Sequence, residues 1–214
     1  MVLWQTPALV MIIGYLLGSI PFGIILTRIA GVGDLRQIGS GNIGATNVLR
    51  TGRKGLAAAT LLLDGAKGAV AVFLGWRLMG GDALANGGAM AGLMAFLGHC
   101  YPVWLRFAGG KGVATMLGVV AALHWPVGLV FAGTWVGMLA LTRISSVGGM
   151  AAAASAPVAA VALGRLDLFA PMLAMALVVL WRHRANMGRL VKGIEPRVGA
   201  KTSREPESSG AETA

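Results

Sequence analysis

The chain carries more apolar segments than one water-soluble core can bury. It has 214 residues, of which 56% are hydrophobic and 12% charged, whereas a soluble domain has about 25% charged residues. A transmembrane helix needs roughly 20 mostly apolar residues. Seven segments meet or approach that length, at residues 3–29, 55–78, 84–105, 112–123, 126–142, 148–164 and 167–182. The sequence therefore predicts an all-α membrane protein, a compact bundle of seven transmembrane helices.

The two ends of the chain differ in character. The first apolar segment lacks a basic leader and is long, so we interpret it as a retained helix rather than a signal peptide. The fourth segment, at 112–123, is short for a full crossing and is expected to be broken or distorted. We expect residues 1–195 to form one transmembrane domain. Residues 196–214 are rich in Ser, Glu, Thr and Gly and are predicted to be a disordered hydrophilic tail.

Lysine and arginine are unequally divided between the two sides that alternate along such a bundle. The first, third and fifth loops and the C-terminal segment hold most of them, while the other side has Arg77 and Arg165. Positive residues favour the cytoplasmic side. The pattern predicts cytoplasmic odd-numbered loops, a cytoplasmic C-terminus and an external N-terminus. It also accounts for the net charge of +10 without a nucleic-acid partner.

Several kinds of catalytic chemistry have no support in the sequence. The single cysteine, Cys100, excludes an intrachain disulfide and multi-cysteine zinc sites. Asp34 and Asp64 are isolated, and the glutamates all lie near the C-terminus, so no divalent-metal cluster is expected. There is no His-x-x-x-x-Asp pair and no Gly-x-Ser-x-Gly motif. We therefore expect neither a metal nor a cofactor.

The first loop has the composition of a phosphate cradle. Glycines let several backbone N–H groups point at one anion, hydroxyl and amide side chains add donors, and an arginine adds a planar cation. A dinucleotide fingerprint is an alternative for this spacing, but that motif needs a strand–turn–helix setting; a simple tight turn is another. The cradle residues are Gly39, Ser40, Gly41, Asn42, Gly44, Thr46, Asn47 and Arg50.

Other unusual polar residues map to the same predicted face. Lys111 lies in a Gly-Gly-Lys-Gly run that departs from a Walker A motif but can still reach a phosphate as a flexible point charge. His99 near the end of its span is either a hydrogen-bonding group of the site or a histidine satisfied by a carbonyl. His183 and Asn186 are spaced to share a helix face. Asp64 and Lys67 are expected to form an ion pair or to contribute to the floor of the site.

Taken in chain order, these motifs resemble the acyl-phosphate:glycerol-3-phosphate acyltransferases of bacteria, the PlsY type. The resemblance covers nearly the whole chain and extends to further motifs. These are GSIPFG at 18–23, LDGAKG at 63–68, the Gly98-His99 pair, GGKG at 109–112, Ser145-Ser146, and the closing pattern from Arg182 to Glu195.

The resemblance implies both an activity and a location. The protein would transfer a fatty acyl group from acyl phosphate to the sn-1 hydroxyl of glycerol 3-phosphate, giving lysophosphatidic acid and phosphate, the first step of bacterial phospholipid synthesis. It would be a monomer in the bacterial inner membrane, with its active site facing the cytoplasm and without metal or cofactor.

From the residues, we assign hypothetical roles within this reaction. The cradle, Arg50 and Lys111 would hold phosphate, His99 would hydrogen-bond near the reacting centre, and the acyl chain would lie between helices. The expected catalytic residues are Ser40, Arg50, His99 and Lys111. The expected substrate-binding residues are Gly39, Gly41, Asn42, Gly44, Thr46, Asn47, Gly110, Gly112, Ser145, His183 and Asn186.

Three other functions fit part of this pattern. A small-organophosphate transporter would explain the cationic face, but its site is expected near the bilayer midplane. A scaffold for lipid enzymes would not need the glycine-rich loop. An acyl-CoA-dependent acyltransferase differs only in its donor, so that donor preference separates it from the first interpretation.

Overall fold

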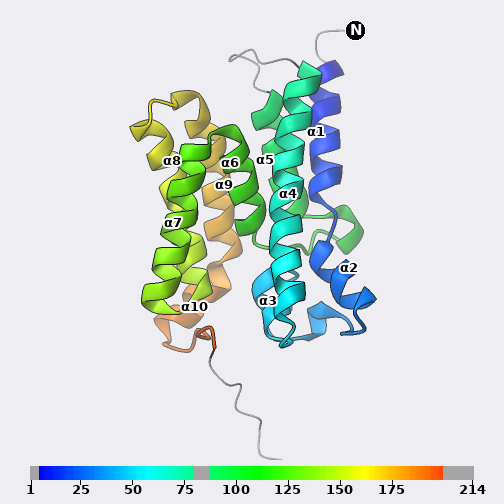
Figure 1. The fold of residues 1–214 in the computed structure, drawn as a ribbon, viewed down its shortest axis with the longest axis vertical. Helices are drawn as coiled ribbons and strands as arrows, with labels where there is room; N and C mark the ends of the chain where they lie inside the picture. The colour runs from blue at the N-terminus through cyan, green and yellow to red at the C-terminus, as the bar shows by residue number, and fades with distance from the viewer. Residues whose placement is uncertain (1–4, 80–86, 200–214) are drawn as a thin grey trace, which may run out of the picture.

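The computed structural model describes residues 5–79 and 87–199, and the described part is helical with connecting loops (Figure 1). Residues 1–4, 80–86 and 200–214, including most of the expected tail, lie outside it. The elements are α1 (Gln5–Gly18), α2 (Phe22–Ile29), η1 (Leu35–Gln37), α3 (Ala45–Leu49), α4 (Lys54–Met79), α5 (Gly87–Cys100), η3 (Val103–Leu105), α6 (Val113–Leu123), α7 (Trp125–Thr142), α8 (Ser145–Ala162), η4 (Leu166–Leu168), α9 (Phe169–Arg182) and α10 (Arg184–Val191).

The described helices include fewer clear membrane spans than the seven expected. Five are long and apolar enough to cross a bilayer: Thr6–Ile29, Lys54–Met79, Gly87–Leu105, Trp125–Thr142 and Ser145–Ala162. A sixth arises if Leu166–Arg182 and Arg184–Val191, which meet at 55°, form one span. The remaining expected segment is α6, whose 11 residues make it the short helix that the sequence indicated.

The first expected helix, 3–29, is not continuous. It breaks between α1 and α2 at Ser19–Pro21, because proline lacks an N–H and its ring clashes with the preceding helical turn. Two distant side chains satisfy carbonyls at the break. Lys67 Nζ donates to the Ile20 carbonyl at 2.8 Å, and Trp104 Nε1 donates to that of Ser19 at 3.1 Å. The break is therefore stabilised by tertiary contacts that sequence spacing does not reveal.

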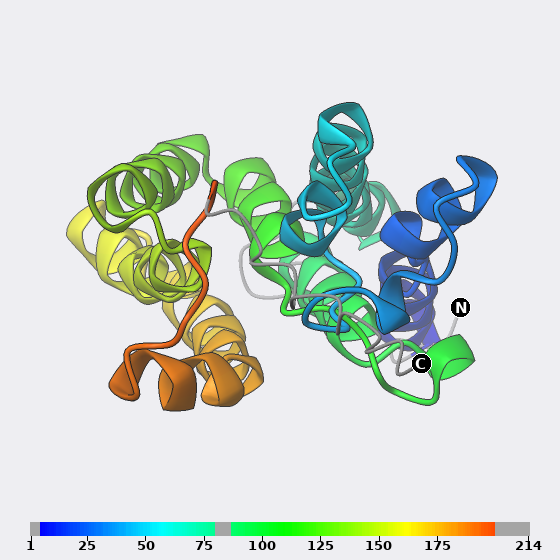
Figure 2. The ribbon, with the colours of Figure 1, turned by 90° about the horizontal axis from the view of Figure 1, so that it is seen from below.

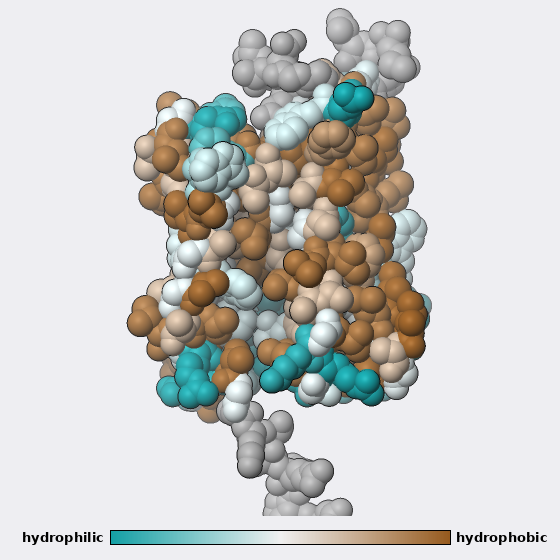
Figure 3. Space-filling model, in the orientation of Figure 1, coloured by the Kyte–Doolittle hydropathy of each residue, from teal (hydrophilic) through white to brown (hydrophobic). Residues whose placement is uncertain are grey.

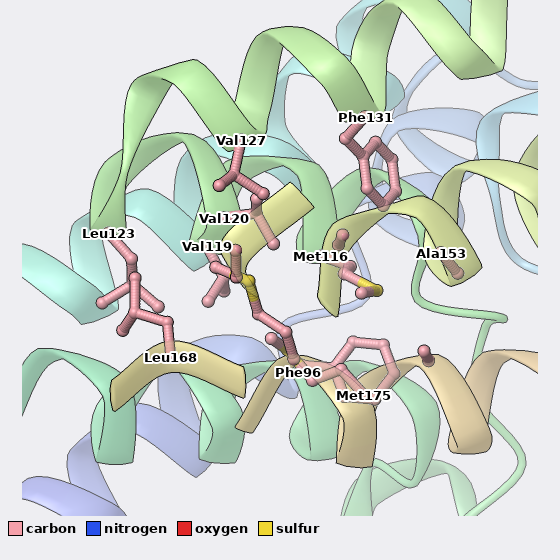
Figure 4. Close-up of a cluster of buried hydrophobic side chains, with 14 of the residues drawn as sticks. Phe96, Met116, Val119, Val120, Leu123, Val127, Phe131, Ala153, Leu168 and Met175 are labelled. Carbon is pink, nitrogen blue, oxygen red and sulfur yellow. The ribbon is translucent and has the colours of Figure 1, made fainter. Parts of the chain in front are cut away.

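The helices form two groups with α6 between them. Helices α1 to α5 lie on one side and α7 to α10 on the other, as the view along the bundle shows (Figure 2). Helix α6 packs against α4 and α7. Its side chains lie in the largest apolar cluster, where Phe96, Met116 and Phe131 are fully buried (Figure 4). This short central helix therefore joins the two groups.

Close helix crossings are made at glycines. A Cβ atom on Gly118 of α6 would overlap the carbonyl oxygen of Gly65 on α4, and one on Gly18 of α1 would overlap that of Ala95 on α5. Small residues allow such backbone contact where lipid supplies no hydrophobic driving force between helices. The glycines therefore set the spacing of the bundle.

The two ends of the molecule are polar and the middle is apolar (Figure 3). The start of α1 lies at one end, whereas α2, α3 and α10 lie at the other (Figure 1). A hydrogen bond between Thr46 and Ser145 joins the first loop to the fifth. A second one, from Lys111 to Asn186, joins the third loop to the C-terminal segment. The expectation that these regions share one end is confirmed.

We expect Gly118→Ala to destabilise the protein by about 1–3 kcal/mol, the usual cost of overpacking, because the new methyl group would push α6 away from α4. The thermal unfolding midpoint in detergent measures this. Gly133→Ala on α7 is the matched control, since nothing lies within 4 Å of a Cβ there. Equal midpoints for the two variants would contradict the proposed role of the crossing.

Candidate active site

A pocket of about 940 Å³ opens between the two helix groups, at the end of the molecule where α3 and α10 lie (Figure 1). Its polar wall comes from the first loop, Lys111 and the segment from His183 to Asn186. Its apolar wall includes Leu61, Leu117 and Trp135. Of the expected site residues, those that line it are Gly39, Ser40, Asn42, Gly44, Thr46, Asn47, Arg50, His99, Lys111, Gly112, Ser145, His183 and Asn186.

The first loop is shaped by the side chain of Asn47 on α3. This residue is 1% exposed, and its Nδ2 donates to the carbonyls of Leu35 at 3.0 Å and Ile38 at 2.8 Å. Its Oδ1 accepts from the Ser40 backbone N–H at 3.2 Å. The amide group is thus occupied by the loop itself, so Asn47 holds the cradle in shape around the exposed Ser40.

Two glycines allow the loop to turn. Gly39 has a φ of 55° and Gly41 a φ of 69°, values that side chains other than glycine rarely adopt. At Gly39 a Cβ would also meet Asn47 Oδ1 and the side chain of Arg50. Gly41 was expected to bind substrate, but it is not among the residues lining the pocket. Its contribution in this structure is conformational.

The Gly109–Gly112 loop is packed directly against His99. A Cβ on Gly110 would overlap the imidazole ring, and one on Gly109 would overlap the His99 carbonyl oxygen. The Gly110 N–H also donates to that carbonyl at 3.0 Å. Gly110, expected as a binding residue, is likewise absent from the pocket lining. Glycine is required there because the loop follows the surface of the histidine.

Arg182 at the end of α9 also holds this loop. Its guanidinium donates to the carbonyl oxygens of Gly109 and Gly110 and stacks over the Tyr101 ring at 5.2 Å. Sequence reasoning gave Arg182 no specific role, because its partners are backbone atoms more than 70 residues away. The loop is therefore held between an imidazole and a guanidinium.

Lys111 is connected to the C-terminal segment by a chain of hydrogen bonds. Its Nζ donates to Asn186 Oδ1 at 2.6 Å, and Asn186 Nδ2 donates to Glu195 Oε1. Glu195 also accepts from Ser146 Oγ and from Arg189 Nε, each at 2.7 Å. Glu195 ends the closing motif in the sequence but was assigned no role there. It could have been noticed because it is the one glutamate that precedes the expected tail.

Burial and neighbouring groups shift the pKa values of Lys111 and Glu195, the two ionisable ends of this hydrogen-bond network. Burial lowers the pKa of Lys111 to about 8, with Arg189, Arg50 and Arg182 acting in the same direction and Glu195 opposing them. Burial works to raise the pKa of Glu195, but hydrogen bonds from Asn186, Ser146 and Arg189 outweigh it and lower that pKa. Lys111 therefore titrates at about pH 8. Glu195 remains a carboxylate and stabilises the positive charge of Lys111.

His183 and Ser145 complete the wall on the α8–α10 side. His183 is 3% exposed, and its Nδ1 lies 2.8 Å from the Val179 carbonyl, which can only accept. In the neutral ring this fixes the proton on Nδ1 and leaves Nε2 as an acceptor. Ser145 Oγ lies 3.0 Å from Thr46 Oγ1 and so joins the cradle to α8.

The expected ion pair between Asp64 and Lys67 is confirmed at 2.8 Å. Asp64 also lines the pocket, so it contributes to the floor as well. His99 Nδ1 lies 3.6 Å from Asp64 Oδ1 and is a buried atom without a hydrogen-bond partner in the described structure. In the described structure, therefore, no carbonyl accepts a hydrogen bond from His99 Nδ1, although the alternative interpretation expected one.

The description of the matching family model is "Glycerol-3-phosphate acyltransferase", and the match covers residues 8–193. The chain belongs to this family. A glycerol-3-phosphate acyltransferase of Erythrobacter litoralis is 55% identical over 91% of this chain and 96% of its own length. One of Maricaulis maris is 55% identical over 89% of this chain and 86% of its own. The resemblance noted from the motifs is therefore confirmed.

Two solved structures have the same fold. Both are crystal structures of PlsY, an integral membrane glycerol 3-phosphate acyltransferase. The glycerol 3-phosphate form has a TM-score of 0.84 and 36% identity, and the lysophosphatidic acid form has 0.83 and 34%. Each match covers 91% of this chain and 96% of that one. Together with the apolar helices, they identify a multi-pass membrane protein.

We expect Glu195→Gln to lower the pKa of Lys111 below its value of about 8, because the carboxylate that favours the charged amine is lost. Labelling with trace acetic anhydride, which reacts with neutral amines, measures this pKa when followed against pH by peptide mass spectrometry. The exposed Lys54 is the internal reference. Ser146→Ala, which keeps the charge at Glu195, is the matched control, and an equal shift in both variants would contradict the electrostatic cause.

Proposed function

We propose that this protein transfers a fatty acyl group from acyl phosphate to the sn-1 hydroxyl of glycerol 3-phosphate, releasing lysophosphatidic acid and inorganic phosphate. The observation that carries the proposal is that one pocket joins a wall that holds Arg50, Lys111 and hydroxyl and amide side chains to an apolar wall. An acyl phosphate has this same division between headgroup and chain. Membership of the family supports glycerol 3-phosphate as the acceptor.

The proposed chemistry needs little beyond positioning and charge stabilisation. An acyl phosphate is a mixed anhydride with a good leaving group, so the protein has to orient two anions and stabilise the developing charge. We assign the phosphate groups to the cradle around Ser40, to Arg50 and to Lys111. No metal or cofactor takes part in this scheme.

His183, Asn186 and Ser145 would orient the glycerol 3-phosphate. The free Nε2 of neutral His183 is suited to accept a hydrogen bond from a glycerol hydroxyl. Asp64 is paired with Lys67, and Glu195 accepts three hydrogen bonds, so both carboxylates on the described pocket wall are engaged. We therefore assign the hydroxyl proton to the phosphate of the substrate, with His99 hydrogen-bonding near the reacting centre.

The acyl chain would lie along the apolar wall formed by Leu61, Leu117, Phe131 and Trp135. We further propose a monomer in the bacterial inner membrane that crosses it seven times, with α6 as the short crossing. The polar end that carries the pocket would face the cytoplasm, because most Lys and Arg residues gather there. The N-terminus would be external. Residues 196–199, the start of the expected disordered tail, are ordered instead, because they line the pocket and the Val198 N–H donates to the Arg143 carbonyl at 2.7 Å. The rest of that expected tail lies outside the described residues.

Purified protein assayed with glycerol 3-phosphate and either palmitoyl phosphate or palmitoyl-CoA tests the reaction and its donor. We expect lysophosphatidic acid with palmitoyl phosphate alone, together with one equivalent of free phosphate. Product from palmitoyl-CoA alone would establish the acyl-CoA-dependent alternative instead. Folded protein without product from either donor would reject the enzyme, and uptake of glycerol 3-phosphate into proteoliposomes would then test transport.

Loss of the Lys111 ammonium should nearly abolish turnover in a protein that still folds. Removal of one stabilising donor costs on the order of 10²–10³ in rate, and we expect Lys111→Ala, Arg50→Ala and Ser40→Ala each to fall in that range. Steady-state kinetics with palmitoyl phosphate measure the loss. Lys192→Ala, at an exposed lysine that does not line the pocket, is the control. A Lys111→Ala variant as active as this control would contradict the assignment.

A further inference from the structure

Three polar residues are buried together where α4 and α5 pack below the centre of the bundle. Asp64, Lys67 and His99 are 2%, 3% and 4% exposed. One carboxylate oxygen, Asp64 Oδ1, faces both partners, at 2.8 Å from Lys67 Nζ and 3.6 Å from His99 Nδ1. Burying charged groups in a membrane protein is costly and usually marks a functional requirement. The family reaction as assigned above uses neither Asp64 nor Lys67.

Each member of this cluster reaches a different part of the site. Lys67 Nζ also donates to the Ile20 carbonyl at the break between α1 and α2. His99 carries the Gly109–Gly112 loop, because its ring lies against Gly110 and its carbonyl accepts the Gly110 N–H. Arg182 donates to the carbonyl oxygens of Gly109 and Gly110 in the same loop. The His99 ring is therefore one of the groups against which the loop that carries Lys111 is packed.

We propose that Asp64 and Lys67 are positioning residues that act through His99 and Gly110 to hold the Lys111 ammonium in the pocket. Lys67 fixes the Asp64 carboxylate, and that carboxylate orients the imidazole by facing Nδ1. The oriented ring then supports the glycine loop from which Lys111 extends to Asn186 at 2.6 Å. This proposal rests on the proposed function, in which Lys111 holds a substrate phosphate.

The distance between Asp64 and His99 fits a contact that tightens during the reaction. At 3.6 Å it is longer than a hydrogen bond, and His99 Nδ1 has no hydrogen-bond partner in the described structure, whereas Asp64 Oδ1 is paired with Lys67. Hydrogen bonds of catalytic sites are often long before substrate binds and shorten in the complex. A shift of the ring toward Asp64 would change the space left to Gly110, because Nε2 of the same ring lies directly against that residue.

Two double variants separate positioning from simple charge neutralisation. Removing one partner of a buried ion pair is strongly destabilising, whereas replacing both is often tolerated. Asp64→Leu with Lys67→Met removes both charges and the acceptor that faces His99. Asp64→Asn with Lys67→Met also removes both charges but keeps an amide oxygen for His99 Nδ1. A purely structural ion pair predicts that the two behave alike.

We expect the leucine variant to lose at least about tenfold in kcat/KM with palmitoyl phosphate and glycerol 3-phosphate, because small displacements of a catalytic group are costly. The asparagine variant should keep most of the activity. Lys111 should also react faster with acetic anhydride in the leucine variant, measured relative to the exposed Lys192. Equal activity and equal Lys111 labelling in the two variants would overturn the proposal.

A third variant keeps the test decisive if the leucine variant does not fold. His99→Leu leaves Asp64 and Lys67 paired but removes the ring that supports Gly110, so its Lys111 labelling should rise. Unchanged Lys111 labelling in folded His99→Leu would overturn the proposal. If wild-type protein shows no acyl transfer with either donor, the proposed function fails. The labelling comparison then decides on the positioning role separately, since it requires no turnover.

Discussion

Backbone contact at glycines is the constraint on which the rest of this structure depends. Lipid is as apolar as the helix surfaces, so burial alone does not bring helices together in a membrane. Here α4 and α6 approach until a Cβ at Gly118 would overlap a carbonyl, and α1 and α5 do so at Gly18. These contacts fix α6 between the two helix groups. The pocket lies at the first turns of this short helix, where Val113, Ala114 and Leu117 form part of its lining.

The same steric principle continues into the polar site. The Gly109–Gly112 loop has no regular secondary structure, yet it is placed by contact with His99 and by the guanidinium of Arg182. Asn47 does the same for the first loop through three backbone groups. Backbone N–H groups bind anions well only if their directions are fixed beforehand. Much of the polar machinery therefore serves to hold the backbone.

Much of the fold could be predicted from the sequence, because membrane helices are recognised by the length and hydropathy of their segments. The Asp64–Lys67 pair was predictable too, since it depends on spacing within one helix. The break at Pro21 was missed because the groups that satisfy its carbonyls, Lys67 and Trp104, come from distant segments. Gly41 and Gly110 were expected to bind substrate because glycines let backbone N–H groups point at an anion, and neither residue lines the pocket. Glycine is also favoured by tight packing and by turns.

The hydroxyl contact between Thr46 and Ser145 gives the mouth of the pocket an unusual chemistry. Its two atoms come from opposite helix groups and each can donate or accept. A hydrogen bond of this kind contributes only about 0.5–1.5 kcal/mol net, since water offers equivalent partners. A polyol can replace it group for group without leaving a hydroxyl unsatisfied. The hydrogen bond that links the two helix groups at the pocket thus joins them through hydroxyls that a polyol can also bind.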